Sequence, residues 1–247
     1  MANLRPMIEV AVADVEDAIA AERAGADRLE LNSGMPLGGL TPSAGLVLEV
    51  LAAVSIPVVV MVRPRPGGFC YTNAQWTTAQ RETEWLLSVG AAGIVFGALD
   101  ADRNIDVGRT TAMRALIVGR EFVFHRAFDL AADWSVALHQ LIDCQVDRVL
   151  SSGQQPEALG GADCLAAMQE KAEHKIEIIA GSGIRSTTIA PLWKLGLRQF
   201  HGTFSRAAID PGYEAARFRF AINDHTRTLD SNDLIAARRL LDQLAAE

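Results

Sequence analysis

Charged and hydrogen-bonding residues follow directly on short apolar runs at several points of the chain. Glu30 closes the run that begins near residue 28, Arg63 and Arg65 follow residues 58–62, and His125 and Asp129 follow residues 121–124. An imidazole beside a carboxylate serves as a general acid or base, because its pKa lies near neutrality and the carboxylate fixes its tautomer. Guanidinium groups match the geometry of carboxylates and phosphates. The pattern predicts an acid–base site for a small anionic or sugar-like substrate.

The remaining candidate site residues follow other apolar runs. Glu9 lies in the first run and is a second candidate base, Ser152 follows the sixth, and His201 ends the last. Gly181 and Gly183 precede a predicted helix, and a loop of this kind holds phosphate on its backbone N–H groups. A tight turn between strand and helix is the alternative interpretation of the two glycines.

The elements that position these residues alternate regularly along the chain. Eight strands are predicted to begin near Met7, Arg28, Pro57, Gly93, Glu121, Arg148, Lys175 and Gln199. Helical patterns fill the intervals at Val15–Ala24, Ser43–Val54, Asn73–Val89, Asp106–Val118, Trp134–Cys144, Pro156–Ala172 and Ser186–Leu195. This α/β alternation predicts a single (β/α)8 TIM-type barrel over residues 1–205. An open doubly wound sheet is the alternative, although no Gly-x-Gly-x-x-Gly follows the first strand.

Side chains alternate along a strand, so strand parity predicts which residues face the barrel axis. Glu9, Glu30 and His125 are expected to point inward. The same parity turns inward Met61, Arg63, Arg65, Asp129 and His201. Structural roles are the alternatives: Glu9, Glu30 and Arg63 pairing as a buried ion network, His125 as a core histidine, and Arg65 fixing the turn at residues 67–68.

Residues 206–247 do not continue the repeat and form a predicted C-terminal helical extension. Residues 234–244 carry one apolar stripe. We expect this helix to pack on the barrel or on a second subunit, and we predict a homodimer.

Composition excludes several classes of function. The chain has 247 residues and a formal net charge of -7, and it lacks basic stretches, which argues against nucleic-acid binding. No apolar run approaches the roughly 20 residues that span a bilayer, and no secretory signal precedes the first strand. We therefore predict a cytoplasmic protein with a small-molecule ligand and no membrane partner.

Three cysteines, Cys70, Cys144 and Cys164, are odd in number and form no Cys-x-x-Cys pair. A disulfide framework or a structural zinc site is therefore not expected. Cys144 and Cys164 fall in predicted helices, where small buried thiols are common. Only Cys70 falls in a loop beside the predicted site.

Seven stretches of the sequence resemble the CutC family. They are residues 25–31 (GADRLEL), 38–43 (GGLTPS), 63–71 (RPRPGGFCY), 96–99 (FGAL), 124–129 (FHRAFD), 148–153 (RVLSSG) and 180–184 (AGSGI). The resemblance extends in register from about residue 8 to 205 and includes the C-terminal helix. It implies a TIM-type barrel and an association with copper homeostasis and copper binding.

The resemblance also implies where copper ligands are expected. Many family members have cysteines at two positions that are Ala11 and Asn32 here. Cu(I) prefers thiolate and thioether ligands, which leaves Cys70 as the candidate metal ligand of this chain. Copper homeostasis is thus the function implied by resemblance. The first alternative is a TIM-barrel enzyme that uses acid–base chemistry on a small anionic or sugar-like substrate, with or without a phosphate group. The second alternative is a non-catalytic scaffold.

Overall fold

Eight parallel strands close into a barrel in the computed structural model, which describes residues 6–208 and 227–246. The strands are β1 (Met7–Val12), β2 (Arg28–Leu31), β3 (Val58–Met61), β4 (Gly93–Phe96), β5 (Glu121–Phe124), β6 (Arg148–Ser151), β7 (Glu177–Gly181) and β8 (Gln199–Gly202). Each strand pairs with its neighbours in sequence, and β8 pairs with β1. The predicted (β/α)8 TIM-type barrel is confirmed, and the open doubly wound sheet is excluded.

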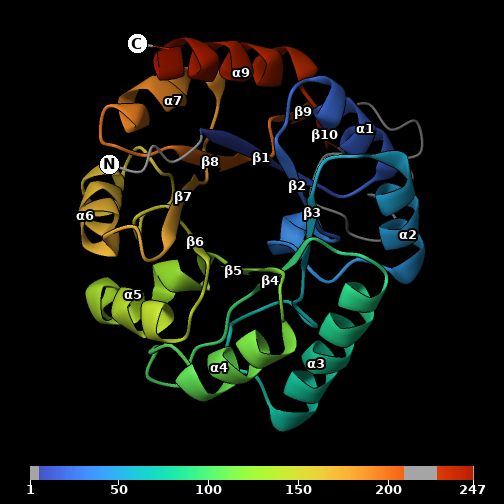
Figure 1. The fold of residues 1–247 in the computed structure, drawn as a ribbon, viewed down its shortest axis with the longest axis vertical. Coiled ribbons are helices and arrows are strands. Elements are labelled where there is room, and N and C mark those ends of the chain that lie inside the picture. The colour runs from blue at the N-terminus through green and yellow to red at the C-terminus, as the bar shows by residue number, and fades with distance from the viewer. Residues whose placement is uncertain (1–5, 209–226, 247) are drawn as a thin grey trace, which may run out of the picture.

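Helices surround the barrel on the outside (Figure 1). They are α1 (Val15–Arg23), α2 (Ala44–Ala53), α3 (Asn73–Ser88), α4 (Val107–Leu116), α5 (Trp134–Asp143), α6 (Ala162–Ala172), α7 (Ser186–Trp193) and α9 (Ser231–Ala246). Polar side chains accept from backbone N–H groups where several of them begin, such as Asp14 at α1 and Ser43 at α2. Gly25, Gly90 and Gly196 follow helix ends with positive φ, as expected for helix termination.

Some short elements differ from the sequence predictions. The sixth helix begins at Ala162 rather than at residue 156. The segment before it brings Gly161 close to Gly153 and Ser152, and a Cβ on Gly161 would lie 2.0 Å from the Ser152 carbonyl oxygen. Two 3-10 helices, η1 (Met35–Leu37) and η2 (Arg126–Leu130), follow β2 and β5. A two-stranded sheet of β9 (Ser205–Ala207) and β10 (Arg227–Leu229) was not predicted.

The apolar core has two layers, which strand parity separates. A small cluster fills the barrel interior and consists of Val59, Met61, Val95, Val123, Leu150 and Ile179. The larger cluster lies between the strands and the surrounding helices. Met61 is thus inside the barrel, as its parity predicted.

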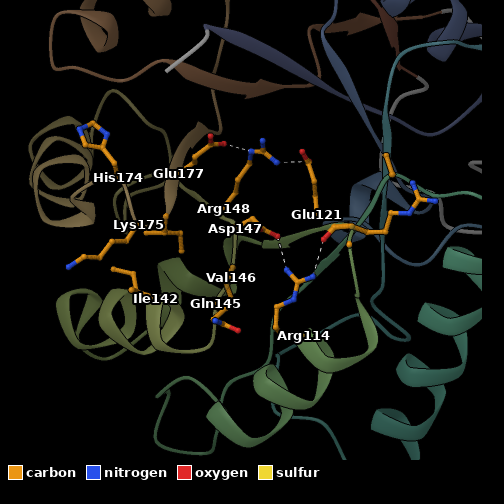
Figure 2. Close-up of a pocket in the computed structure, with 14 residues that line it drawn as sticks. Arg114, Glu121, Ile142, Gln145, Val146, Asp147, Arg148, His174, Lys175 and Glu177 are labelled. Atoms are coloured by element: carbon orange, nitrogen blue, oxygen red, sulfur yellow. Dashed lines mark hydrogen bonds and ion pairs between the residues drawn. The ribbon is translucent and has the colours of Figure 1, made fainter. Parts of the chain in front are cut away.

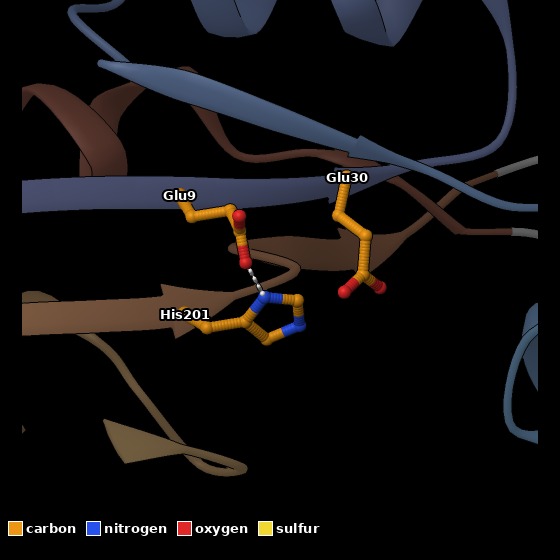
Figure 3. A group of neighbouring side chains, drawn as sticks. All are labelled: Glu9, Glu30 and His201. Atoms are coloured by element: carbon orange, nitrogen blue, oxygen red, sulfur yellow. Dashed lines mark hydrogen bonds and ion pairs between the residues drawn. The ribbon is translucent and has the colours of Figure 1, made fainter. Parts of the chain in front are cut away.

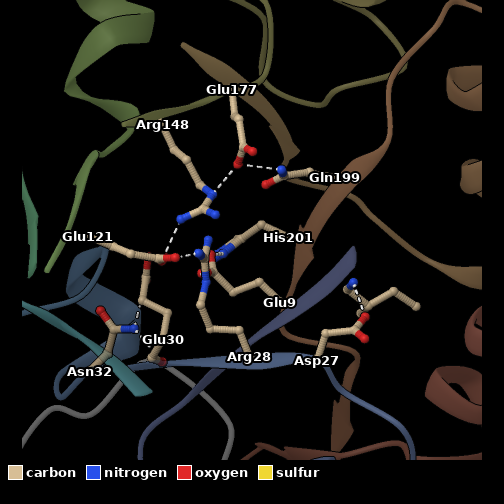
Figure 4. Close-up of polar contacts among 11 residues, drawn as sticks. Glu9, Asp27, Arg28, Glu30, Asn32, Glu121, Arg148, Glu177, Gln199 and His201 are labelled. Atoms are coloured by element: carbon tan, nitrogen blue, oxygen red, sulfur yellow. Dashed lines mark hydrogen bonds and ion pairs between the residues drawn. The ribbon is translucent and has the colours of Figure 1, made fainter. Parts of the chain in front are cut away.

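Charged side chains form a ladder across the barrel at the amino-terminal ends of its strands (Figure 4). Arg28 donates to Glu9 over 2.5 Å and also pairs with Glu121. Arg148 pairs with Glu121 over 2.5 Å and with Glu177. Each charge of this ladder therefore has a partner of opposite sign, which offsets the cost of burying it.

The C-terminal helix α9 packs on the barrel, beside α7 and α1 (Figure 1). Leu234, Ala237 and Leu241 form its buried face. Asp233 accepts hydrogen bonds from the Ser186 N–H and hydroxyl at the start of α7. The helix therefore packs on the barrel, which is one of the two positions predicted for it. Residues 209–226 and 247 of the predicted 206–247 extension lie outside the described residues. The homodimer and the cytoplasmic location stay predictions.

Substitution of the two ladder arginines separates their contributions to stability. We expect Arg28→Met to lower the free energy of unfolding by about 3–5 kcal/mol, because it leaves the fully buried Glu9 without a guanidinium partner. We expect only about 1–2 kcal/mol for Arg148→Met, because Glu121 and Glu177 are partly exposed and keep other partners. Urea denaturation measures both values. Equal losses would show that the burial of Glu9 does not dominate the ladder.

Candidate functional site

A cavity of about 360 Å³ opens at the carboxyl-terminal ends of the strands. Its walls include four of the predicted site side chains, Glu30, Arg63, His125 and His201, together with Gly183. The first four come from β2, β3, β5 and β8 or from the residues that directly follow these strands, so parts of the chain that are distant in sequence meet at one end of the barrel. The carboxyl-terminal end is where TIM-type barrels carry their sites.

Glu9, His201 and Glu30 form a buried group at the bottom of this cavity (Figure 3). His201 Nδ1 lies 2.7 Å from Glu9 Oε1. Burial raises the pKa of Glu9, but the charge of Arg28 and the hydrogen bond from His201 prevail and lower this pKa to about 2. Burial lowers the pKa of His201, but the charge of Glu30 and the contact with Glu9 raise it above its ordinary value. Glu9 is thus a carboxylate that favours the protonated form of His201.

The spacing of this group would also suit a metal ion, since its ligand atoms lie within 4.8 Å of one another. Both carboxylate oxygens of Glu9 are already occupied, however: Oε1 by His201 and Oε2 by Arg28. We therefore interpret the group as an ion network whose charges shift the pKa of Glu30.

Glu30 is the least satisfied carboxyl group of the cavity. Its Oε1 accepts from the Asn32 side-chain amide over 2.9 Å, whereas its Oε2 is buried and has no partner. Burial and the charge of Glu9 raise the pKa of Glu30. A buried carboxyl with a raised pKa is suited to giving and taking protons near neutral pH.

His125 is a neutral hydrogen-bond donor. Its Nδ1 accepts from the Ala127 backbone N–H over 3.2 Å, so the proton of the neutral ring resides on Nε2. Burial and the charge of Arg63 lower the pKa of His125 to about 3. The Nε2 atom is buried without a partner. Gly97 makes room for the ring, because a Cβ there would lie 2.6 Å from it.

Arg63 is held by the loops around it. It donates to the carbonyl oxygens of Leu37 and Gly39, each over 2.8 Å, and to that of Gly67 over 2.7 Å. Its guanidinium lies 5.0 Å from the centre of the Phe69 ring, and that ring lies 4.8 Å from the imidazole of His125. The Arg63 Nε remains without a partner. The predicted pairing of Arg63 with Glu9 and Glu30 is wrong, because backbone oxygens take three of its bonds.

Four buried polar atoms of the cavity walls thus lack a partner. They are Glu30 Oε2, Asn32 Oδ1, Arg63 Nε and His125 Nε2. Each unsatisfied buried polar atom costs about 1–3 kcal/mol, so four in one cavity indicate that something else completes their bonds. Two are donors, one is an acceptor, and Glu30 takes either role according to its protonation. The arrangement suits a compact polar ligand.

Arg65 and Cys70 were predicted at the site but do not line the cavity. Arg65 is directed to the loop, where it donates to the carbonyl oxygens of Gly68 and Cys70 over 2.7 and 2.8 Å. The inward prediction for Arg65 was wrong because β3 ends at Met61 and strand parity ends with it. Cys70 is exposed and does not line the cavity.

Asp129 and Ser152 bond to each other rather than to the cavity. The Ser152 hydroxyl donates to Asp129 over 2.9 Å, and Arg126 donates to the same carboxylate over 2.8 Å. The predicted role of Asp129 in fixing the tautomer of His125 is wrong, since the Ala127 N–H does so. Asp129 lies in η2, beyond the strand, so its inward parity was not a valid inference.

The predicted glycine loop is divided between two roles. Gly183 lines the cavity, whereas Gly181 lies against Leu150, where a Cβ would come within 2.5 Å. The Ser186 N–H at the start of α7, which a phosphate would use, already donates to Asp233. The site therefore offers less to a phosphate than the sequence indicated.

A larger hollow of about 890 Å³ lies at the opposite end of the barrel (Figure 2). Its walls include Glu121, Arg148 and Glu177, the first residues of their strands. Arg148 is paired there with both glutamates, and Arg114 pairs with Asp147 over 2.8 Å. These groups satisfy one another, so this hollow has a weaker claim to a ligand than the cavity does.

Sequence analysis missed three contributors to the site. Arg28 has the same strand parity as Glu30, and this parity would have identified it as a partner of Glu9. Phe69 occurs in a stretch that carries the family resemblance and Asn32 directly follows another, but no pattern in their spacing indicates contact with His125 or Glu30.

The fold and the cavity define a TIM-type barrel with a polar ligand site at the carboxyl ends of its strands. The chain matches the CutC family model over residues 6–206 and belongs to the CutC family. A family protein CutC from Treponema denticola is 40% identical over 87% of each chain, and one from Pectobacterium atrosepticum is 37% identical over 83% of this chain and 81% of the relative.

A solved structure shares the fold as well. It belongs to a Streptococcus agalactiae protein that carries the name copper homeostasis protein CutC. The two chains are 27% identical, with a TM-score of 0.76 over 80% of this chain and 98% of the other. Among the helices described for this chain, none combines the length and the apolar character needed to cross a bilayer.

The two cavity histidines should titrate differently. We expect His125 to remain neutral, with its proton on Nε2, from pH 5 to pH 8, because its pKa is about 3. We expect the pKa of His201 to lie above its ordinary value and to fall in Glu9→Gln, because that change removes a carboxylate that stabilises the imidazolium. Imidazole nitrogen shifts in NMR measure both. A His125 that titrates near pH 6.5 would contradict its assignment as a neutral donor.

Proposed function

We propose that this CutC-family protein binds a small hydroxy- or oxo-carboxylate in the cavity and catalyses acid–base chemistry on it. The observation that carries the proposal is that four residues lining one cavity each keep a buried polar atom without a partner. Enzymes use such preorganised groups, because they need no rearrangement when charge develops on the substrate.

Charge favours a ligand with a negative group. Arg63 is 5% exposed, and no carboxylate of the described residues lies within ion-pair distance of it. A buried cation without a counter-ion is costly, and a ligand carboxylate would supply one. Because Asp233 already takes the Ser186 N–H, a carboxylate suits the site better than a phosphate does.

Each cavity group then has a chemical role. The Arg63 Nε–H and the His125 Nε2–H donate to ligand oxygens and stabilise negative charge that develops there. Glu30 exchanges a proton with the ligand hydroxyl or with the adjacent carbon. The positive charge of His201, which Glu9 favours, opposes the rise in the pKa of Glu30 that burial causes. Asn32 orients the Glu30 carboxyl through its amide.

A panel of hydroxy acids, oxo acids, sugar acids, neutral sugars and sugar phosphates tests the proposal by thermal shift. We expect hydroxy or oxo acids to raise the melting temperature. We expect Arg63→Ala and His125→Ala each to weaken the affinity by about 10- to 100-fold, since each removes a buried hydrogen bond to a charged group.

Arg65→Ala is the matched control for the arginine. Arg65 lies two residues away but outside the cavity, so we expect its loss to leave the shift unchanged. A panel in which only sugar phosphates bind, or in which no carboxylate binds, would contradict the proposed ligand.

Copper binding is the second candidate function, and the name carried by the Streptococcus agalactiae relative favours it. The donor atoms fit a thiolate site poorly. Cys70 is exposed and outside the cavity, Cys144 is buried, Cys164 is half-buried in α6, and no group of three His, Cys, Asp or Glu ligands among the described residues includes a cysteine. Cu(I) prefers sulfur ligands, and the sulfur atoms among the residues that line this cavity are the thioethers of Met35 and Met61, with no thiolate beside them.

Chelator competition with Cu(I) tests this candidate. We expect Cys70→Ser to leave the Cu(I) affinity within about twofold of wild type, because no second ligand lies beside Cys70 to hold the ion. Cys144→Ser serves as a control for general effects of losing a thiol. Loss of stoichiometric binding in Cys70→Ser alone would establish the copper site that the sequence predicted at this residue.

A further inference from the structure

A second hollow of about 460 Å³ adjoins the cavity at the same end of the barrel. Three residues line both spaces: Ala11, Met35 and Thr203. Ala11 is the residue before the last of β1, Met35 begins η1 and Thr203 follows β8, so the two spaces lie beside each other where these three segments come together. A ligand in the cavity therefore has room to extend past Met35 and Thr203.

The second hollow differs from the cavity in how its polar groups are bonded. Ala11, Val12, Ala13, Met35 and Pro36 line it together with Asp14, Asp17, Thr203, Ser205 and Arg227. A part of the ligand that carries few polar groups can contact the apolar residues of this lining.

The polar residues of the second hollow are already bonded within the protein. Asp17 accepts from the Thr228 hydroxyl over 2.8 Å and from the Leu229 N–H over 3.0 Å. Asp14 caps α1, and Arg227 donates to the Ser205 hydroxyl and carbonyl, each over 2.8 Å. Binding there depends on shape and burial rather than on polar recognition.

We infer that the ligand has two parts: a carboxylate-bearing head in the cavity and an apolar tail in the second hollow. This inference rests on the proposed function and adds a substrate class to it. The head satisfies the free atoms of Arg63, His125 and Glu30, and the tail excludes water from the walls around Ala13 and Pro36. The ligand class is therefore a hydroxy- or oxo-acid with an extended aliphatic or aromatic substituent.

A series of unbranched 2-hydroxy acids, from lactate to 2-hydroxyoctanoate, tests this inference by calorimetry. Each buried methylene should lower the Kd by about fourfold until the second hollow is filled. Ala13→Phe places a ring in the wall of that hollow only. We expect it to abolish the gain with chain length while the Kd for lactate stays within about twofold.

Two further variants serve as controls. Ala53→Phe adds the same ring at the exposed end of α2 and should keep the dependence on chain length. Arg63→Ala should weaken every member of the series, which places the head in the cavity.

Each outcome is decisive. If lactate binds through Arg63 but longer acids bind no better, the inferred tail site is wrong and the proposed function stands. The tail site is also wrong if Ala13→Phe leaves the dependence on chain length intact. If no member of the series binds the wild-type protein, the cavity does not bind a carboxylate-bearing head. Both the proposed function and this inference are then wrong.

Discussion

One buried carboxylate links the closure of the barrel to the chemistry of its cavity. Glu9 is fully buried on β1 and uses one oxygen for Arg28 and the other for His201. Arg28 continues into the ladder of Glu121 and Arg148, whereas His201 lies beside Glu30 at the bottom of the cavity. An unpaired charge in a barrel interior is costly. Arg28 and His201 both use Glu9 as a partner, so the ladder and the cavity group depend on this one carboxylate.

The way in which the other charges are bonded decides which atoms remain for a ligand. Arg63 gives three hydrogen bonds to loop carbonyl oxygens and keeps only Nε, and His125 spends Nδ1 on a backbone N–H and keeps only Nε2. Each side chain is thus held in place by the bonds it has already made. A donor fixed in this way stabilises charge without first having to reorient, which is the main requirement for electrostatic catalysis.

Local pattern was sufficient to predict the barrel, but only part of the site. Alternation within strands is regular, so parity correctly turned Glu9, Glu30 and His201 to the interior. Parity has no meaning once the chain leaves the strand, which is why Arg65 and Asp129 were placed wrongly. The bonds that hold Arg63 come from loops separated from it by up to 26 residues, and no periodicity in the sequence reports such contacts.

Asn32 shows how a single side chain separates the two candidate functions. A thiol at this position would offer a soft ligand to a metal ion in the cavity. The amide instead donates to Glu30 over 2.9 Å, while its oxygen lies close to Gly39, where a Cβ would come within 2.5 Å. Asn32 thereby fixes the orientation of the one carboxyl group whose raised pKa suits proton transfer. In the proposed function this residue therefore supports acid–base chemistry, whereas its amide offers Cu(I) no sulfur ligand.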